Sequence, residues 1–123
     1  MTTRALVSIV DDDESVRESL PDLVRQLGFA ARAFPSAEAF LASEFVGATR
    51  CLLLDVAMPG MSGPDLQREL VTRRQRIPII FITASGDRAI RSQLLADGAV
   101  ECLIKPFSET ALVEALKTAV RKD

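Results

Sequence analysis

Histidine is absent from this chain of 123 residues, and cysteine occurs only at Cys51 and Cys102. The lack of histidine excludes histidine-based catalysis, a zinc–histidine site, and any role as a histidine phosphodonor. Both cysteines fall within apolar runs and lack CxxC spacing. We therefore expect two buried free thiols rather than a disulfide or a metal site.

The chain also lacks a long basic run and a long apolar stretch. Its formal net charge is −2, from 15 basic and 17 acidic residues. Nucleic acids and anionic membranes both require a concentrated positive face, so we expect proteins or small ions as partners, with no direct nucleic-acid or membrane binding. The N-terminal residues MTTRALVSIV contain no apolar stretch long enough for a secretory signal or a membrane span. This pattern predicts a cytoplasmic protein.

Short apolar runs and segments of helical period alternate along the whole chain, which is typical of βα units. With 48% hydrophobic residues, the length suits a single domain over residues 1–123. The apolar runs predict strands at 5–10, 29–34, 51–55, 79–83 and 100–104. The helical segments lie at about 16–27, 37–43, 64–74, 88–97 and after Ser108.

This order predicts an α/β fold with a flavodoxin-like, doubly wound, five-stranded parallel sheet and five helices. Consecutive βα units connect with right-handed crossovers, so helices cover both faces only if the winding reverses once. In five-stranded sheets the reversal commonly gives the strand order 2-1-3-4-5. The loops after strands one and three then part and leave a crevice at the carboxyl edge of the sheet.

Polar residues at the ends of the predicted strands should meet at this crevice. Asp11 and Asp12 follow the first strand, Asp55 ends the third, Thr83 ends the fourth and Lys105 follows the fifth. Two like charges about 4 Å apart repel by about 4 kcal/mol at an effective dielectric of 20. Either a raised pKa or a bound hard cation must offset this repulsion. An all-oxygen site suits Mg²⁺, which takes one or two carboxylates and leaves positions for phosphate oxygens.

With Mg²⁺ bound, three of these residues have roles in phosphoryl transfer. Asp55 would be the nucleophile, Lys105 would pair with a phosphoryl oxygen, and Thr83 would donate its hydroxyl to another. Each residue taken singly also has an ordinary structural explanation, as a turn former, a surface lysine or a strand end. Asp13 and Glu14 fit the acidic start of a helix and are assigned no chemistry.

The chain resembles the receiver domain of two-component response regulators over essentially its full length, and is most similar to the nitrogen-fixation regulator group. Four motifs carry this resemblance: IVDDDESVRESL, LLLDVAMPGMSG, IIFITASGD and LIKPF. It implies that Asp12, Asp55 and the backbone carbonyl of Ala57 bind Mg²⁺ directly, with Asp11 acting mainly through water. It also implies that Asp55 accepts phosphate from a histidine kinase or a histidine phosphotransfer protein, and that Thr83 and Lys105 sense and hold it.

The resemblance further implies a signalling protein rather than a conventional enzyme. Phosphorylation would change the surface formed by the fourth helix, fifth strand and fifth helix, and so control a downstream effector, with transcription as the expected output. A homodimer that forms on phosphorylation is a further expectation. In this group a DNA-binding domain follows the receiver, so the chain could be part of a longer regulator.

The chain departs from the family pattern at two places. Many receivers have Tyr or Phe where this chain has Cys102, which has no ring to couple to Thr83. Ala57 and Ser85 occupy positions that tune the lifetime of the phosphoryl group. Because Ala57 has no polar side chain to orient an attacking water, we expect slow self-dephosphorylation.

Two alternatives remain open. A receiver that has lost the phosphorylation response could act as a constitutive interaction module. The departure from the family pattern at Cys102 keeps this alternative open. A flavodoxin-like FMN binder would share the fold, but its phosphate loop needs Ser, Thr and Gly amides where this chain has three aspartates at 11–13.

Overall fold

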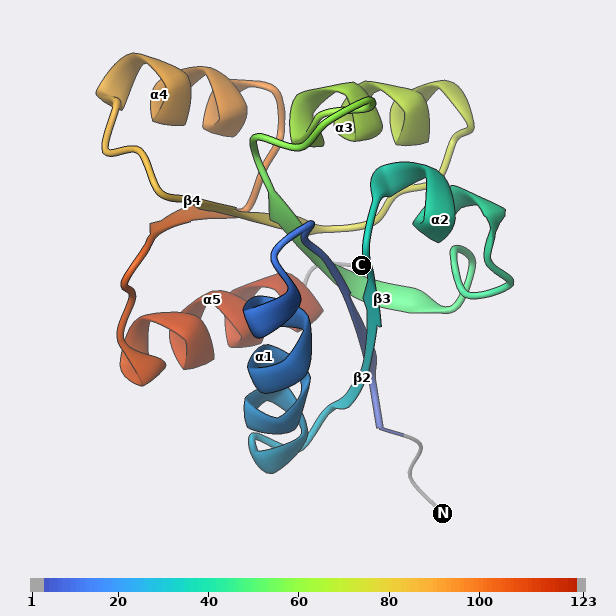
Figure 1. The fold of residues 1–123 in the computed structure, drawn as a ribbon, viewed down its shortest axis with the longest axis vertical. Coiled ribbons are helices and arrows are strands. Elements are labelled where there is room, and N and C mark those ends of the chain that lie inside the picture. Colours follow the sequence, from blue (N-terminus) through green and yellow to red (C-terminus); the bar gives the residue numbers. More distant parts are fainter. Residues whose placement is uncertain (1–3, 122–123) are drawn as a thin grey trace.

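The computed structural model describes residues 4–121, and these form one parallel sheet covered by helices on both faces. The strands are β1 (Leu6–Val10), β2 (Ala30–Phe34), β3 (Thr49–Asp55), β4 (Ile79–Thr83) and β5 (Glu101–Ile104). The helices are α1 (Glu14–Gln26), α2 (Ala37–Ala42), α3 (Gly63–Thr72), α4 (Arg88–Ala96) and α5 (Glu109–Arg121). The strand order β2-β1-β3-β4-β5 confirms the predicted topology. Figure 1 shows α2, α3 and α4 on one side of the sheet and α1 and α5 on the other.

The central strands are buried on both faces, and alternate side chains serve two apolar cores. Cys51 and Leu53 of β3 join the α1/α5 core, in which side chains of α1 and α5 pack on the sheet. Leu52 and Leu54 join the α2/α3/α4 core on the opposite face. Cys51 and Cys102 are buried free thiols, as predicted.

Three predicted helix starts are confirmed at the level of single hydrogen bonds. The Asp13 carboxylate accepts from Ser15 N at 2.9 Å and caps α1, and Glu14 lies in the first turn. Asp87 caps α4 by accepting from Ala89 N at 2.9 Å. The Ser108 hydroxyl accepts from Ala111 N at 3.0 Å at the start of α5. These caps satisfy amides that helix starts leave unpaired.

Two predicted boundaries are wrong. β3 begins at Thr49 rather than Cys51. The buried Thr49 hydroxyl forms a hydrogen bond of 2.7 Å with the hydroxyl of Ser8, so the strand can start before its apolar run does. α3 ends at Thr72 rather than near Arg74, because Arg74 adopts a left-handed conformation with φ of 59°. The amide of Gln75 then donates to the Leu70 carbonyl at 2.9 Å and closes the helix.

The strand register brings the carboxyl ends of the strands to one edge. Val10 of β1 lies opposite Leu54 of β3, and Asp55 lies opposite Ile82 of β4. Thr83 in turn lies opposite Ile104 of β5. The residues that end or follow these strands therefore share one edge of the sheet.

Between residues 4 and 121, no helix has both the length and the apolar character needed to cross a membrane.

Candidate functional site

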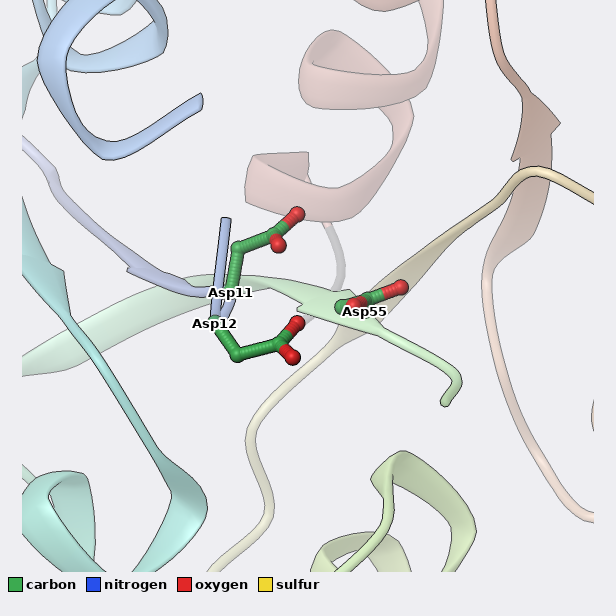
Figure 2. Close-up of side chains that lie close together, drawn as sticks. All are labelled: Asp11, Asp12 and Asp55. Carbon is green, nitrogen blue, oxygen red and sulfur yellow. The ribbon is translucent and has the colours of Figure 1, made fainter. Parts of the chain in front are cut away.

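Three aspartates form an acidic cluster at this edge. Asp11 and Asp12 follow β1, Asp55 ends β3, and one carboxylate oxygen from each lies within 4.8 Å of the others (Figure 2). Asp11 and Asp55 are buried, with 1% and 9% of their surface exposed, whereas Asp12 is exposed. Two segments far apart in the sequence thus contribute carboxylates to one site, as the predicted topology required.

The turn between β1 and α1 holds Asp11 in place. Its Oδ1 atom accepts from the backbone amide of Asp13 at 2.9 Å, and its carbonyl accepts from Arg17 at 3.0 Å. Asp13 is itself fixed as the α1 cap. The Asp11 carboxylate is therefore positioned by the start of the following helix.

Asp55 has an unusually high pKa in this surrounding. Burial, which is the largest cause, acts together with the charge of Asp11 and a hydrogen bond with Asp12 to raise the pKa of Asp55 from 3.8 to about 7. Lys105 acts in the opposite direction. Its Nζ atom lies 3.3 Å from Asp11 Oδ2, so a single ammonium faces three carboxyl groups. The cluster as it stands carries more negative charge than its own residues neutralise.

This donor set fits Mg²⁺, which receiver domains generally bind at their acidic pocket. The three converging side chains all offer oxygen. Burial, and then the charge of Asp11, raise the pKa of Asp55, so its ionised form is unfavourable here and a hard cation would stabilise it. A histidine ligand is excluded because the chain has none, and both thiols are buried in the cores. The chemistry of the site therefore favours Mg²⁺ over zinc.

Thr83 ends β4 beside the cluster and is largely buried, with 9% of its surface exposed. Its Oγ1 atom accepts from the Ser85 amide at 3.0 Å, which leaves the hydroxyl hydrogen free to donate elsewhere. The Ser85 hydroxyl accepts from Asp87 N at 3.3 Å, and Asp87 caps α4. A hydrogen-bonded chain thus runs from Thr83 to the N-terminus of α4.

All six residues predicted for the site line one cleft of about 390 Å³. They are Asp11, Asp12, Asp55, Ala57, Thr83 and Lys105, and Asp13, Ala84 and Ser85 complete the lining. The tertiary fold therefore brings together every residue named for this site from the sequence.

Two residues that support the site were missed in the sequence. A Cβ atom on Gly63 would lie 2.4 Å from the Asp55 carbonyl oxygen and 2.9 Å from the Phe81 ring, so only glycine allows α3 to start this close to β3. In the sequence, Gly63 is only the last residue of the motif LLLDVAMPGMSG. Glu38 of α2 accepts from the Met61 amide at 3.1 Å in the loop after Asp55, and no sequence pattern linked these two residues.

Cys102, which departs from the family pattern, points into the α2/α3/α4 core and is 4% exposed. Its neighbour Glu101 accepts from Arg91 of α4 at 2.8 Å and from the Cys102 amide at 2.9 Å. The contact between α4 and β5 at this point is therefore an ion pair beside a small buried thiol.

Comparison with known proteins identifies the family. The sequence matches the family model described as "Response regulator receiver domain" over residues 7–117. Nodulation protein W of Bradyrhizobium diazoefficiens is 43% identical over 122 residues, which cover 99% of this chain and 54% of that protein. Transcriptional regulatory protein FixJ of Rhizobium meliloti is 42% identical over 113 residues, covering 92% of this chain and 55% of FixJ.

The similarity extends to three dimensions. A crystal structure of FixJ-N has a TM-score of 0.87 to this structure at 40% identity, covering 100% of this chain and 98% of that one. The chain spans about half the length of the curated relatives it matches. By sequence and by fold, the chain belongs to the response regulator receiver domains of two-component systems, close to the FixJ group.

Proposed function

We propose that residues 1–123 form one receiver domain that acts as a phosphorylation-controlled switch, with Asp55 as the acceptor. The donor is a histidine kinase or a histidine phosphotransfer protein. The observation that carries this proposal is the convergence of Asp55, Thr83 and Lys105 in one cleft with two further carboxylates. Receiver domains are signalling proteins rather than conventional enzymes, so the chain's own chemistry is limited to gaining and losing this phosphoryl group.

In the proposed reaction an Asp55 carboxylate oxygen attacks the phosphorus of the donor phosphohistidine. A P–O bond forms as the P–N bond breaks, and the donor imidazole leaves with the electron pair. Lys105 pairs with one phosphoryl oxygen as a point charge, and Thr83 donates its free hydroxyl hydrogen to another. Asp55 reacts as the carboxylate, so its high pKa in the metal-free protein opposes the reaction until positive charge is supplied.

Asp12, Asp55 and the carbonyl of Ala57 would hold Mg²⁺, with Asp11 acting through water. When bound, the ion supplies positive charge that neutralises the carboxylates and the phosphoryl oxygens. The burial of Asp11 and Asp55 reduces the screening of this charge interaction by solvent. Ala57, in the loop after β3, also lines the cleft that holds Asp11 and Asp55.

The phosphoryl group would be read out through the surface formed by α4, β5 and α5. Movement of Thr83 toward a phosphoryl oxygen would pull on Ser85 and Asp87, and so on the start of α4. This route does not require the ring that Cys102 lacks. Ile90 on α4 and Ile104 at the end of β5 are each 42% exposed and offer apolar area for a partner.

The output is proposed to be transcription, carried by a downstream effector protein or domain. The relatives are about twice as long as this chain, and FixJ is named as a transcriptional regulatory protein. We further propose that phosphorylation leads to homodimer formation, and that the protein is cytoplasmic, as the family generally is.

We also propose that the phosphoryl group is lost slowly. Ala57 lines the cleft without a polar side chain that could orient water for attack on the acyl phosphate. Introducing an amide at this position with Ala57→Asn should shorten the phosphoryl half-life at least severalfold, measured by intact mass after the donor is removed. An unchanged half-life would exclude this explanation.

The proposed function is tested by incubating the protein with acetyl phosphate and Mg²⁺ and measuring its intact mass. Wild type should gain the mass of one phosphoryl group, whereas Asp55→Asn and wild type in EDTA should not. Asp22→Asn on α1 is the matched control, because Asp22 lies outside the cleft and should leave the adduct unchanged. Absence of an Asp55-dependent adduct would refute the proposal and favour a phosphorylation-independent interaction module. A yellow purified protein would instead indicate FMN.

A further inference from the structure

Glu38, in the first turn of α2, contacts the loop that joins β3 to α3. Its Oε2 atom accepts from the Met61 amide at 3.1 Å. The preceding residue, Gly60, has a positive φ of 74°, and a Cβ atom there would lie 2.8 Å from the same Oε2 atom. The carboxylate therefore lies in the space that the missing side chain of Gly60 leaves open.

The same loop is fixed at two other points. At its base, the Gly63 amide donates to the Val56 carbonyl at 3.0 Å and closes the loop. Near its middle, Met58 is 8% exposed and packs in the α2/α3/α4 core with Ala37 and Phe40, both fully buried on α2. The loop and α2 thus both contribute side chains to this core, in addition to the hydrogen bond made by Glu38.

Glu38 itself does not line the cleft, whereas Ala57, from the same loop, does. In Figure 1, α2 lies beside α3 on one face of the sheet, next to the loop that leads from β3 into α3. Apart from a long-range effect of its charge, Glu38 can therefore act on the site only through the backbone of residues 56–62. Glu38 also lies in the first turn of α2, where the helix dipole favours a negative charge.

We propose that Glu38 is a positioning residue: by accepting from the Met61 amide, it keeps the β3–α3 loop in the conformation that presents the Ala57 carbonyl to the acidic cluster. This inference rests on the proposed Mg²⁺ site. It assigns to α2, which contributes no residue to the cleft, a role in setting the affinity for the ion. A carboxamide can still accept from Met61, whereas a methyl group cannot.

The test compares Glu38→Ala with Glu38→Gln and with the control Glu44→Ala, which removes a nearby exposed glutamate just beyond α2. In metal-free protein, hydrogen exchange of the Met61 amide, followed by NMR, should accelerate about fivefold in Glu38→Ala, as expected for loss of one hydrogen bond. The Mg²⁺ dissociation constant, measured by calorimetry, should rise by a similar factor of about five. Glu38→Gln should stay within about twofold of wild type in both measurements, and Glu44→Ala should match wild type.

Urea unfolding in EDTA confirms that each variant is folded before its affinity is interpreted. Unchanged Mg²⁺ affinity in Glu38→Ala would overturn the inference, whether or not the Met61 amide exchanges faster. Equal loss of affinity in Glu38→Ala and Glu44→Ala would also overturn it, because a general charge effect would then suffice. If wild type itself does not bind Mg²⁺, the proposed metal site fails, and the exchange data separate that result from a failure of the loop contact.

Discussion

Replacing Asp55 with asparagine should stabilise the metal-free protein at alkaline pH, although it removes the proposed phosphoryl acceptor. Asp55 is buried beside Asp11 and Asp12, and burial together with these neighbours raises its pKa to about 7. In the unfolded chain the carboxyl group ionises near its ordinary pKa of 3.8. Ionisation therefore costs more in the folded protein, and asparagine avoids this cost while keeping a similar shape.

The size of the effect follows from the two pKa values. The interval from 3.8 to about 7, at about 1.36 kcal/mol per pH unit, gives an upper limit of about 4 kcal/mol. Asp12 is exposed and the cleft is open to solvent, so water screens part of the repulsion. We expect about 2 kcal/mol in the free energy of unfolding at pH 8.

The sign of the pH dependence is fixed by the direction of the shift. The folded protein retains its Asp55 proton over a pH range in which the unfolded chain has lost it, so Asp55 lowers stability progressively between about pH 4 and pH 7. Near pH 4 both states hold much of the proton and the penalty is small. The advantage of Asp55→Asn should therefore be about half of its full value at pH 4.5 and reach its full value by pH 8.

The assay is urea unfolding in EDTA at pH 4.5 and pH 8, with Asp22→Asn as a control for loss of an exposed carboxylate. Asp22 pairs with Arg25 on the surface of α1, so its replacement should change stability by less than about 1 kcal/mol at both pH values. Added Mg²⁺ should stabilise wild type more than Asp55→Asn, because the variant lacks one proposed ligand. An equal or lower stability of Asp55→Asn at pH 8 would refute the electrostatic reasoning.

Three further predictions concern other residues. Lys105→Gln should raise the pKa of Asp55 still further, because Lys105 lowers it. The pKa is measured by ¹³C NMR titration in EDTA, and a lower pKa in the variant would contradict this prediction. Gly63→Ala should destabilise the fold by about 3 kcal/mol in urea unfolding, since its Cβ atom would lie 2.4 Å from the Asp55 carbonyl; a neutral result would show that α3 can move away. Arg74→Gly should stabilise by about 0.5–1 kcal/mol, because φ of 59° suits glycine, and a loss of stability in the same assay would indicate a contact through the arginine side chain.

The sequence by itself determined the elements and their order. Apolar runs such as 51–55 and 79–83 can be recognised because strands buried on both faces need a continuous apolar sequence, and helix caps such as Asp87 act within one turn. From these local signals and the right-handed crossover rule, the strand order could be predicted. Because parallel strands end at one edge, the residues Asp11, Asp55 and Lys105 could also be predicted to meet.

Only the tertiary structure decided how these residues interact. The 3.3 Å contact from Lys105 to Asp11 joins residues 94 positions apart, and the pKa of Asp55 depends on a depth of burial that no local pattern encodes. The start of β3 depends on a hydroxyl of Ser8, and the contact of Glu38 with Met61 depends on where α2 packs on the sheet. Local periodicity is a property of neighbouring residues, whereas distances, desolvation and long-range hydrogen bonds arise only when separate segments pack against one another.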